Sequence, residues 1–163
     1  MKMAALFLPM PVLLFSTIAW SASVTVDVNL SPAGSFKGKT SDIKGFVTKK
    51  GDEVSARNIV VNLKNFKTGI ELRDKHTLKH LETDKYPEAI LISATGKKGK
   101  GAGKIRIRGI EKEITGTYKI NNNELLADFK LNLADFKITN VKYMGAGVDD
   151  EVVLHIAVPI KGP

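Results

Sequence analysis

The side chains able to do chemistry are few, and their spacing matches no familiar catalytic pattern. Cysteine is absent, which removes thiol nucleophiles and soft metal ligands. In Gly34-Ser35-Phe36-Lys37-Gly38 the serine is the second residue, whereas a nucleophile elbow needs it third. We therefore predict a protein that has no catalytic residues and is not an enzyme.

Two histidines, His76 and His80, stand four residues apart and would share one face of a helix. Imidazoles at this spacing can ligate a metal ion, but the metalloprotease pattern has a glutamate where this chain has Thr77. A third histidine, His155, falls in a predicted strand, on its outer face. The pattern favours a solvated helix over a metal site, so we predict no metal and no cofactor.

A run rich in lysine and glycine covers residues 97–104. A phosphate-binding loop would continue with a lysine-serine or lysine-threonine pair and a helix, whereas Ile105-Arg106-Ile107-Arg108 alternates as a strand does. The run is therefore typical of a flexible hairpin tip, whose charge would attract an anionic envelope surface. Aromatic residues do not interleave with the lysines, so nucleic acid is not an expected partner.

The N-terminal residues have the pattern of a secretory signal peptide. Lys2 precedes an uncharged apolar stretch over residues 3–20, and the small residues 21–23 follow. Two prolines interrupt the stretch, which is shorter than the ~20 apolar residues of a membrane span. We predict a cleaved signal peptide over residues 1–23 and one periplasmic domain over residues 24–163, held together without disulfides.

Apolar and polar residues alternate along the rest of the chain, which predicts half-buried strands joined by short turns. The strands are expected over residues 24–30, 36–49, 54–64, 88–95, 105–108, 113–120, 125–133 and 151–158. Glu71 to Leu81 breaks the alternation and predicts one short helix between the third and fourth strands. An antiparallel sheet with one apolar face can hide that face by closing on itself. We therefore predict an all-β, eight-stranded antiparallel barrel with one inserted α-helix.

Four segments, in order along the chain, resemble the successive signatures of the YceI-like family. They read NFKTGIELRDKH from Asn65, KYPE from Lys85, GKIRIRGIEK from Gly103 and GVDDEV from Gly147. The resemblance implies a lipocalin-like barrel in the periplasm. It further implies that the interior of the barrel binds a polyisoprenoid or another long amphiphilic lipid.

Candidate ligand-binding residues are the inward members of the strands and the apolar residues of the helix region. From the strands they are Phe46, Leu63, Leu91, Ile107, Tyr118, Phe129, Leu131 and Leu133, and from the helix region Phe66, Ile70, Leu72 and Leu78. For each of them the alternative is an ordinary core position.

Arg73, Asp74 and His76 occupy the polar helix start that recurs in the family, which implies that they orient a head group at the mouth of the barrel. The alternative for Arg73 and Asp74 is that they tie the helix to the barrel.

Two functions of different classes remain open at this point. One is a carrier or sequestering protein for an isoprenoid or other long-chain amphiphilic lipid, acting as a monomer or homodimer. The other is a solid barrel, filled by its bulky inward aliphatic residues, that acts as an envelope or stress-related interaction protein through its basic outer surface. A hollow apolar interior would distinguish the first from the second.

Overall fold

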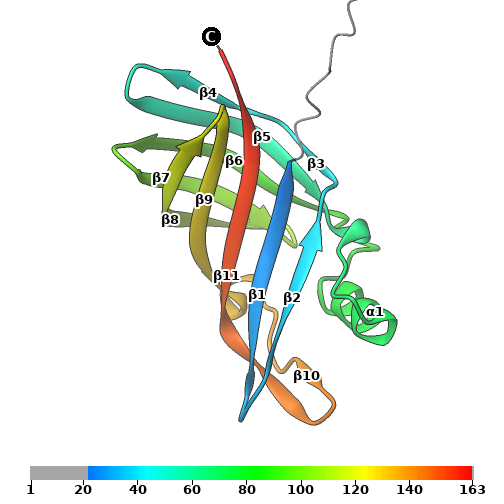
Figure 1. Cartoon of the computed structure of the whole chain (residues 1–163). Helices are drawn as coiled ribbons and strands as arrows, with labels where there is room; N and C mark the ends of the chain where they lie inside the picture. The colour runs from blue at the N-terminus through cyan, green and yellow to red at the C-terminus, as the bar shows by residue number, and fades with distance from the viewer. Residues whose placement is uncertain (1–21, 163) are drawn as a thin grey trace, which may run out of the picture.

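The strands form one strongly curved sheet (Figure 1). Alternating apolar residues of these strands are buried on its inner face. The computed structural model describes residues 22–162, so the predicted signal peptide lies almost wholly outside the described residues. The strands are β1 (Ser23–Ser31), β2 (Ser35–Thr40), β3 (Ile43–Lys44), β4 (Val47–Lys50), β5 (Glu53–Asn62), β6 (Glu88–Lys97), β7 (Lys100–Ile107), β8 (Ile110–Asn121), β9 (Glu124–Asn132), β10 (Lys142–Tyr143) and β11 (Ala146–Lys161). One α-helix, α1 (Glu71–His80), and two short 3-10 helices, η1 (Leu63–Asn65) and η2 (Leu133–Phe136), complete the fold.

Seven strands close the barrel in the order β11-β4-β5-β6-β7-β8-β9, and β9 pairs back onto β11. All these pairings are antiparallel except the short one between β4 and β11, where Val47 lies opposite Ile160. β11 is long enough to pair with β9 along one edge and with β1 and then β4 along the other. β1 and β2 therefore extend the wall beyond the closed ring.

The barrel class is confirmed, but the count of eight strands is not. The single strand expected over residues 36–49 is divided into β2, β3 and β4. Gly45 lies at a break with φ near +131°, and a Cβ there would lie 2.9 Å from Cγ1 of Ile59. Glycine alone adopts this backbone conformation readily, so the chain changes direction at this residue. Because of the additional strands, α1 lies between β5 and β6 rather than between a third and a fourth strand.

The hairpin between β6 and β7 is tighter than predicted. Only Lys98 and Gly99 form its turn, both with positive φ, and Lys100 already belongs to β7. Two successive residues of positive φ match the twist of an antiparallel hairpin. The glycines Gly101 and Gly103 consequently lie within the barrel wall and not in a flexible tip.

The apolar interior consists of two adjoining clusters of buried side chains. The first includes Val24, Phe129 and Phe136, and the second includes Val54 and Val158. No described helix is long and apolar enough to span a bilayer.

Candidate functional site

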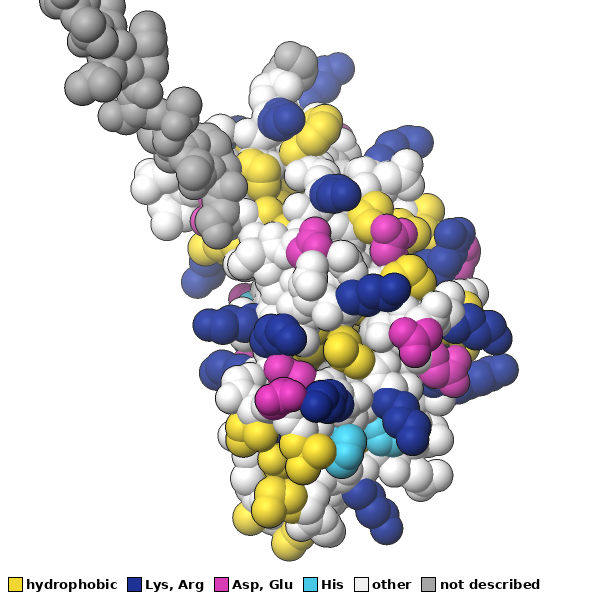
Figure 2. Space-filling model, turned by 90° about the vertical axis from the view of Figure 1, so that its right-hand side faces the viewer, with side chains coloured by type: hydrophobic (Ala, Val, Ile, Leu, Met, Phe, Trp, Pro, Cys, Tyr) yellow, Lys and Arg dark blue, Asp and Glu magenta, His cyan; other side chains and the backbone are white. Residues whose placement is uncertain are grey.

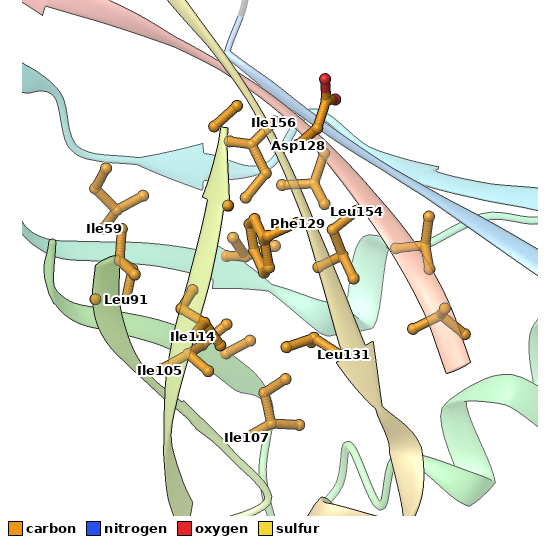
Figure 3. Close-up of a pocket in the computed structure, with 18 of the residues that line it drawn as sticks. Ile59, Leu91, Ile105, Ile107, Ile114, Asp128, Phe129, Leu131, Leu154 and Ile156 are labelled. Carbon is orange, nitrogen blue, oxygen red and sulfur yellow. The ribbon is translucent and has the colours of Figure 1, made fainter. Parts of the chain in front are cut away.

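The inward faces of the strands enclose an apolar cavity of about 270 Å³. Its lining comes from every strand of the closed ring and also from β1, β2 and α1. In Figure 3, aliphatic side chains of β5, β6 and β7 lie opposite those of β9 and β11, and the carboxylate of Asp128 points away from them. This barrel is therefore hollow, and its interior offers hydrocarbon surface to a ligand.

One part of the cavity wall is made of small residues. The lining positions of β6, β7 and β8 include Gly96, Gly101, Gly103 and Gly116. The ring of Tyr118 crosses this region, and a Cβ on Gly96 would lie 2.6 Å from its Cε1 atom. Gly96 thus makes room for an aromatic ring that faces the cavity.

Eight of the predicted ligand-binding residues line this cavity. They are Leu63, Phe66, Leu91, Ile107, Tyr118, Phe129, Leu131 and Leu133. The period-two pattern identified all of them except Phe66, because a strand alternates its side chains between the two faces of the sheet, whereas Phe66 was proposed from the helix region.

Four other predicted apolar residues lie outside the cavity lining, which corrects their expected inward orientation. Phe46 is 42% exposed and its ring lies 4.7 Å from Nζ of Lys161, because the break at residue 45 ends the alternation of the preceding strand. Ile70 and Leu72 are exposed, and Leu78 is only partly buried and absent from the lining.

The helix presents a different face to the cavity from the one its leucines predicted. Thr77 and His80 line the cavity from α1, together with Leu81 at the end of the helix. His76, predicted to orient a head group, is exposed instead. The i, i+3 spacing of Thr77 and His80 is the signal that could have identified this polar pair.

Arg73 connects the helix to β2 and β10, and Asp74 connects it to the segment that precedes it. The guanidinium of Arg73 donates to the carbonyl oxygen of Thr68 at 2.6 Å and stacks 4.2 Å from the ring centre of Phe36 and 5.3 Å from that of Tyr143. The carboxylate of Asp74 accepts hydrogen bonds from the amide and the hydroxyl of Thr68, each at 2.6 Å. These contacts favour the alternative considered for this pair, in which the two residues hold the helix in place and do not orient a head group.

Burial and hydrogen bonding act in opposite directions on Asp74. Burial works to raise the pKa of its carboxyl, but the two Thr68 hydrogen bonds and the charges of Lys67 and Arg73 outweigh it and hold the pKa below its usual value. Asp74 is therefore an ionised anchor at the start of the helix.

Burial lowers the pKa of His80, and three neighbouring basic side chains add to that effect. They are His76 and Lys79 on the same helix and Arg108 from the turn after β7. Each repels the charge of a protonated imidazole. Lys79 and Arg108 supply the fixed positive charges near His80, and Arg108 is itself paired with Glu82.

A second, polar crevice of about 400 Å³ lies beside the turn between β7 and β8. Arg108 spans it, donating to the carbonyl oxygens of Phe136 and Lys137 at 3.2 and 2.6 Å and to Glu82 at 2.5 Å. These bonds join the turn, η2 and the loop after α1, which makes the crevice a structural junction.

His155 lies on the outer face, as its strand position predicted. Its Nδ1 atom is 2.5 Å from Oδ1 of Asp128, and Nε2 is 3.5 Å from Oδ2 of Asp27. Over residues 22–162, no group of three or more potential ligands has an arrangement that would hold a metal ion.

Residues 16–160 match the family model described as YceI-like domain. Among solved structures, the chain is similar to a polyisoprenoid binding domain from Saccharophagus degradans implicated in plant cell wall breakdown, with 12% identity, coverage of 86% of this chain and 93% of that chain, and a TM-score of 0.57. It is also similar to BcnA of Burkholderia cenocepacia, with 15% identity, coverage of 83% and 94%, and a TM-score of 0.64. At these identities the likeness shows a shared fold. Comparison with curated protein sequences gave no match.

Proposed function

This chain belongs to the YceI-like family, and on that premise we propose that it is an exported binding protein that holds the tail of a polyisoprenoid or other long amphiphilic lipid in its barrel. The single observation that carries the proposal is the apolar cavity enclosed by the ring of strands. The polyisoprenoid binding domain of similar fold supports this ligand class. The protein would act as a carrier or sequestering protein, as a monomer or homodimer, and not as an enzyme.

The physical argument rests on the transfer of hydrocarbon from water. Each buried methylene contributes about 0.8 kcal/mol, so a long tail gains ample binding energy in an interior of this kind. A volume of about 270 Å³ lies just below the ~300–1,000 Å³ of typical ligand pockets. Such a space fits one slender chain better than a bulky fused-ring ligand.

The hollow interior also weighs against the alternative of a solid barrel that acts only through its outer surface. An anionic envelope surface remains a proposed second partner, because the chain carries a formal net charge of +8. We place the protein in the periplasm on the pattern of residues 1–23. β1 begins at Ser23, so cleavage after residue 23 would remove only the first residue of this strand.

The direct test is lipid extraction from protein purified out of its native envelope. We expect mass spectrometry of the organic extract to show about one long-chain lipid per barrel, as one enclosed cavity predicts. Ala127→Leu, which adds bulk to a residue of the cavity lining, should lower the lipid content roughly tenfold or more, because the added side-chain volume occupies space that the lipid tail needs.

The matched control is Ala134→Leu, the same change at an exposed residue of η2. This variant should retain the lipid content of the unaltered protein. Circular dichroism and melting curves would establish that both variants are folded. Lipid-free extracts of the unaltered protein, or equal lipid content in both variants, would contradict the proposal.

A further inference from the structure

The polar groups around the cavity are unevenly placed. Asp128, Ser55 and Thr115 border the cavity from exposed strand positions, and Figure 3 shows the carboxylate of Asp128 directed away from it. Thr77 and His80 are partly buried and reach the cavity from α1. Tyr118 of β8 is also partly buried and lines the cavity, but α1 brings two hydrogen-bonding side chains to one place at the edge of this largely apolar space.

Thr77 and His80 are three residues apart, a spacing that places two side chains on the same side of a helix. Among the hydrogen bonds of the described residues, none uses the hydroxyl of Thr77 or the imidazole of His80. Arg73 and Asp74, on the same helix, are by contrast engaged with Thr68. The pair on the cavity side thus has hydrogen-bonding capacity to offer a ligand.

The side chains that add to the lowered pKa of His80 are all basic. They are His76 and Lys79 from α1 and Arg108 from the turn after β7. The nearby carboxylate of Glu82 is engaged with Arg108 at 2.5 Å. A positive environment attracts an anion, and a neutral imidazole can take up a proton when an anion binds beside it.

We propose that Thr77 and His80 form a head-group site that binds the acidic oxygens of a phosphate or carboxylate carried by the amphiphile whose tail lies in the cavity. This inference rests on the proposed lipid-binding function. It gives the ligand an orientation, with its tail in the barrel and its acidic end at α1. It also replaces the exposed His76 with His80 as the histidine that contacts a ligand.

The site predicts proton uptake on binding. The bound anion raises the pKa of His80, which burial and the cations around it hold low in the free protein. Affinity for an acidic amphiphile should therefore increase as the pH falls through the range in which His80 takes up its proton. Affinity for the matching alcohol should not change with pH in this way. Phosphate also titrates near pH 6, so a carboxylate probe is the cleaner reporter of His80.

The experiment compares three probes by titration calorimetry on the full mature protein after removal of bound lipid. The probes are geranylgeraniol, geranylgeranyl phosphate and palmitate. We expect the phosphate to bind roughly tenfold more tightly than the alcohol, which is the effect of about one charge-assisted hydrogen bond. His80→Leu should abolish that difference, and His80→Gln should abolish the increase in palmitate affinity at lower pH.

The matched control is His76→Leu, which removes the exposed histidine of the same helix and should change the preference less than about twofold. Melting curves would show whether each variant is folded, and His80→Gln provides a second, polar replacement if the leucine variant is unstable. Equal binding of alcohol and phosphate would overturn the head-group site and leave the proposed function standing. Failure of all three probes to bind would contradict the proposed function and the head-group site together.

Discussion

At the scale of single residues, the ring of Phe66 packs against the backbone of Gly38 in the barrel wall. Gly38 lies in β2, and a Cβ on it would overlap the ring of Phe66. Next to this contact, the backbones of Lys39 and Lys67 exchange two hydrogen bonds of 2.7 and 2.9 Å. The ring therefore covers a glycine at the one bridge that joins β2 to the segment before α1.

Gly38→Ala tests this packing. We expect a loss of about 1–3 kcal/mol in the free energy of unfolding, because the added methyl group forces the Phe66 ring out of place. Denaturant titration would measure the change. Gly147→Ala is the matched control, since its Cβ would have its nearest neighbour, the oxygen of Ser31, 4.0 Å away. Equal stability of the two variants would contradict the packing argument.

At the scale of secondary structure, α1 is held by its first turns and not by an apolar stripe. Leu72 is 56% exposed, whereas Asp74 is buried and bonded twice to Thr68. Arg73 stacks between Phe36 of β2 and Tyr143 of β10. Polar and cation–π contacts thus fix the angle of the helix, and that angle decides which residues face the cavity.

Asp74→Asn tests this attachment through its pH dependence. Since the folded pKa of Asp74 lies below its unfolded value, its stabilisation is complete above about pH 4 and is lost as the pH falls through the folded pKa. We expect the variant to lose about 1–2 kcal/mol at neutral pH and to show a flatter acid limb in urea titrations. Glu71→Gln, 84% exposed and paired with Lys75, should cost less than about 0.5 kcal/mol. If the free energy of unfolding fell with decreasing pH equally steeply in the unaltered protein and in Asp74→Asn, this role would be excluded.

At the scale of the whole molecule, an apolar interior is combined with a basic exterior. Figure 2 shows lysine and arginine side chains spread over the face that carries α1, with hydrophobic side chains gathered at its lower end. Met144, in the turn between β10 and β11, is 87% exposed. This surface is consistent with the proposed contact with an anionic lipid layer.

Vesicle sedimentation tests the proposed envelope partner. We expect the protein to sediment with phosphatidylglycerol vesicles at ~0.01 M salt, where charges act over about 30 Å, and to be released at ~1 M salt, where they act over about 3 Å. Vesicles of phosphatidylcholine, which carry no net charge, are the control. Binding that is equal for the two lipids, or unchanged by salt, would exclude a charge-driven contact.

The sequence by itself determined the features that depend on local periodicity. Alternation in β7, β9 and β11 placed Ile107, Phe129 and Leu131 inside and His155 outside, because a strand has only two faces. The motifs from Asn65 onward indicated the family that the match over residues 16–160 shows.

Only the tertiary structure decided which face of α1 reaches the cavity and where the alternation of the second strand ends. His80 and not His76 lines the cavity, because the hydrogen bonds between Asp74 and Thr68 set the rotation of the helix. Phe46 lies outside because Gly45 breaks the strand. The hollow of about 270 Å³ is the difference between the space that the ring encloses and the volume of its side chains. Such a difference depends on how the strands close around one another, which no local pattern of residues records.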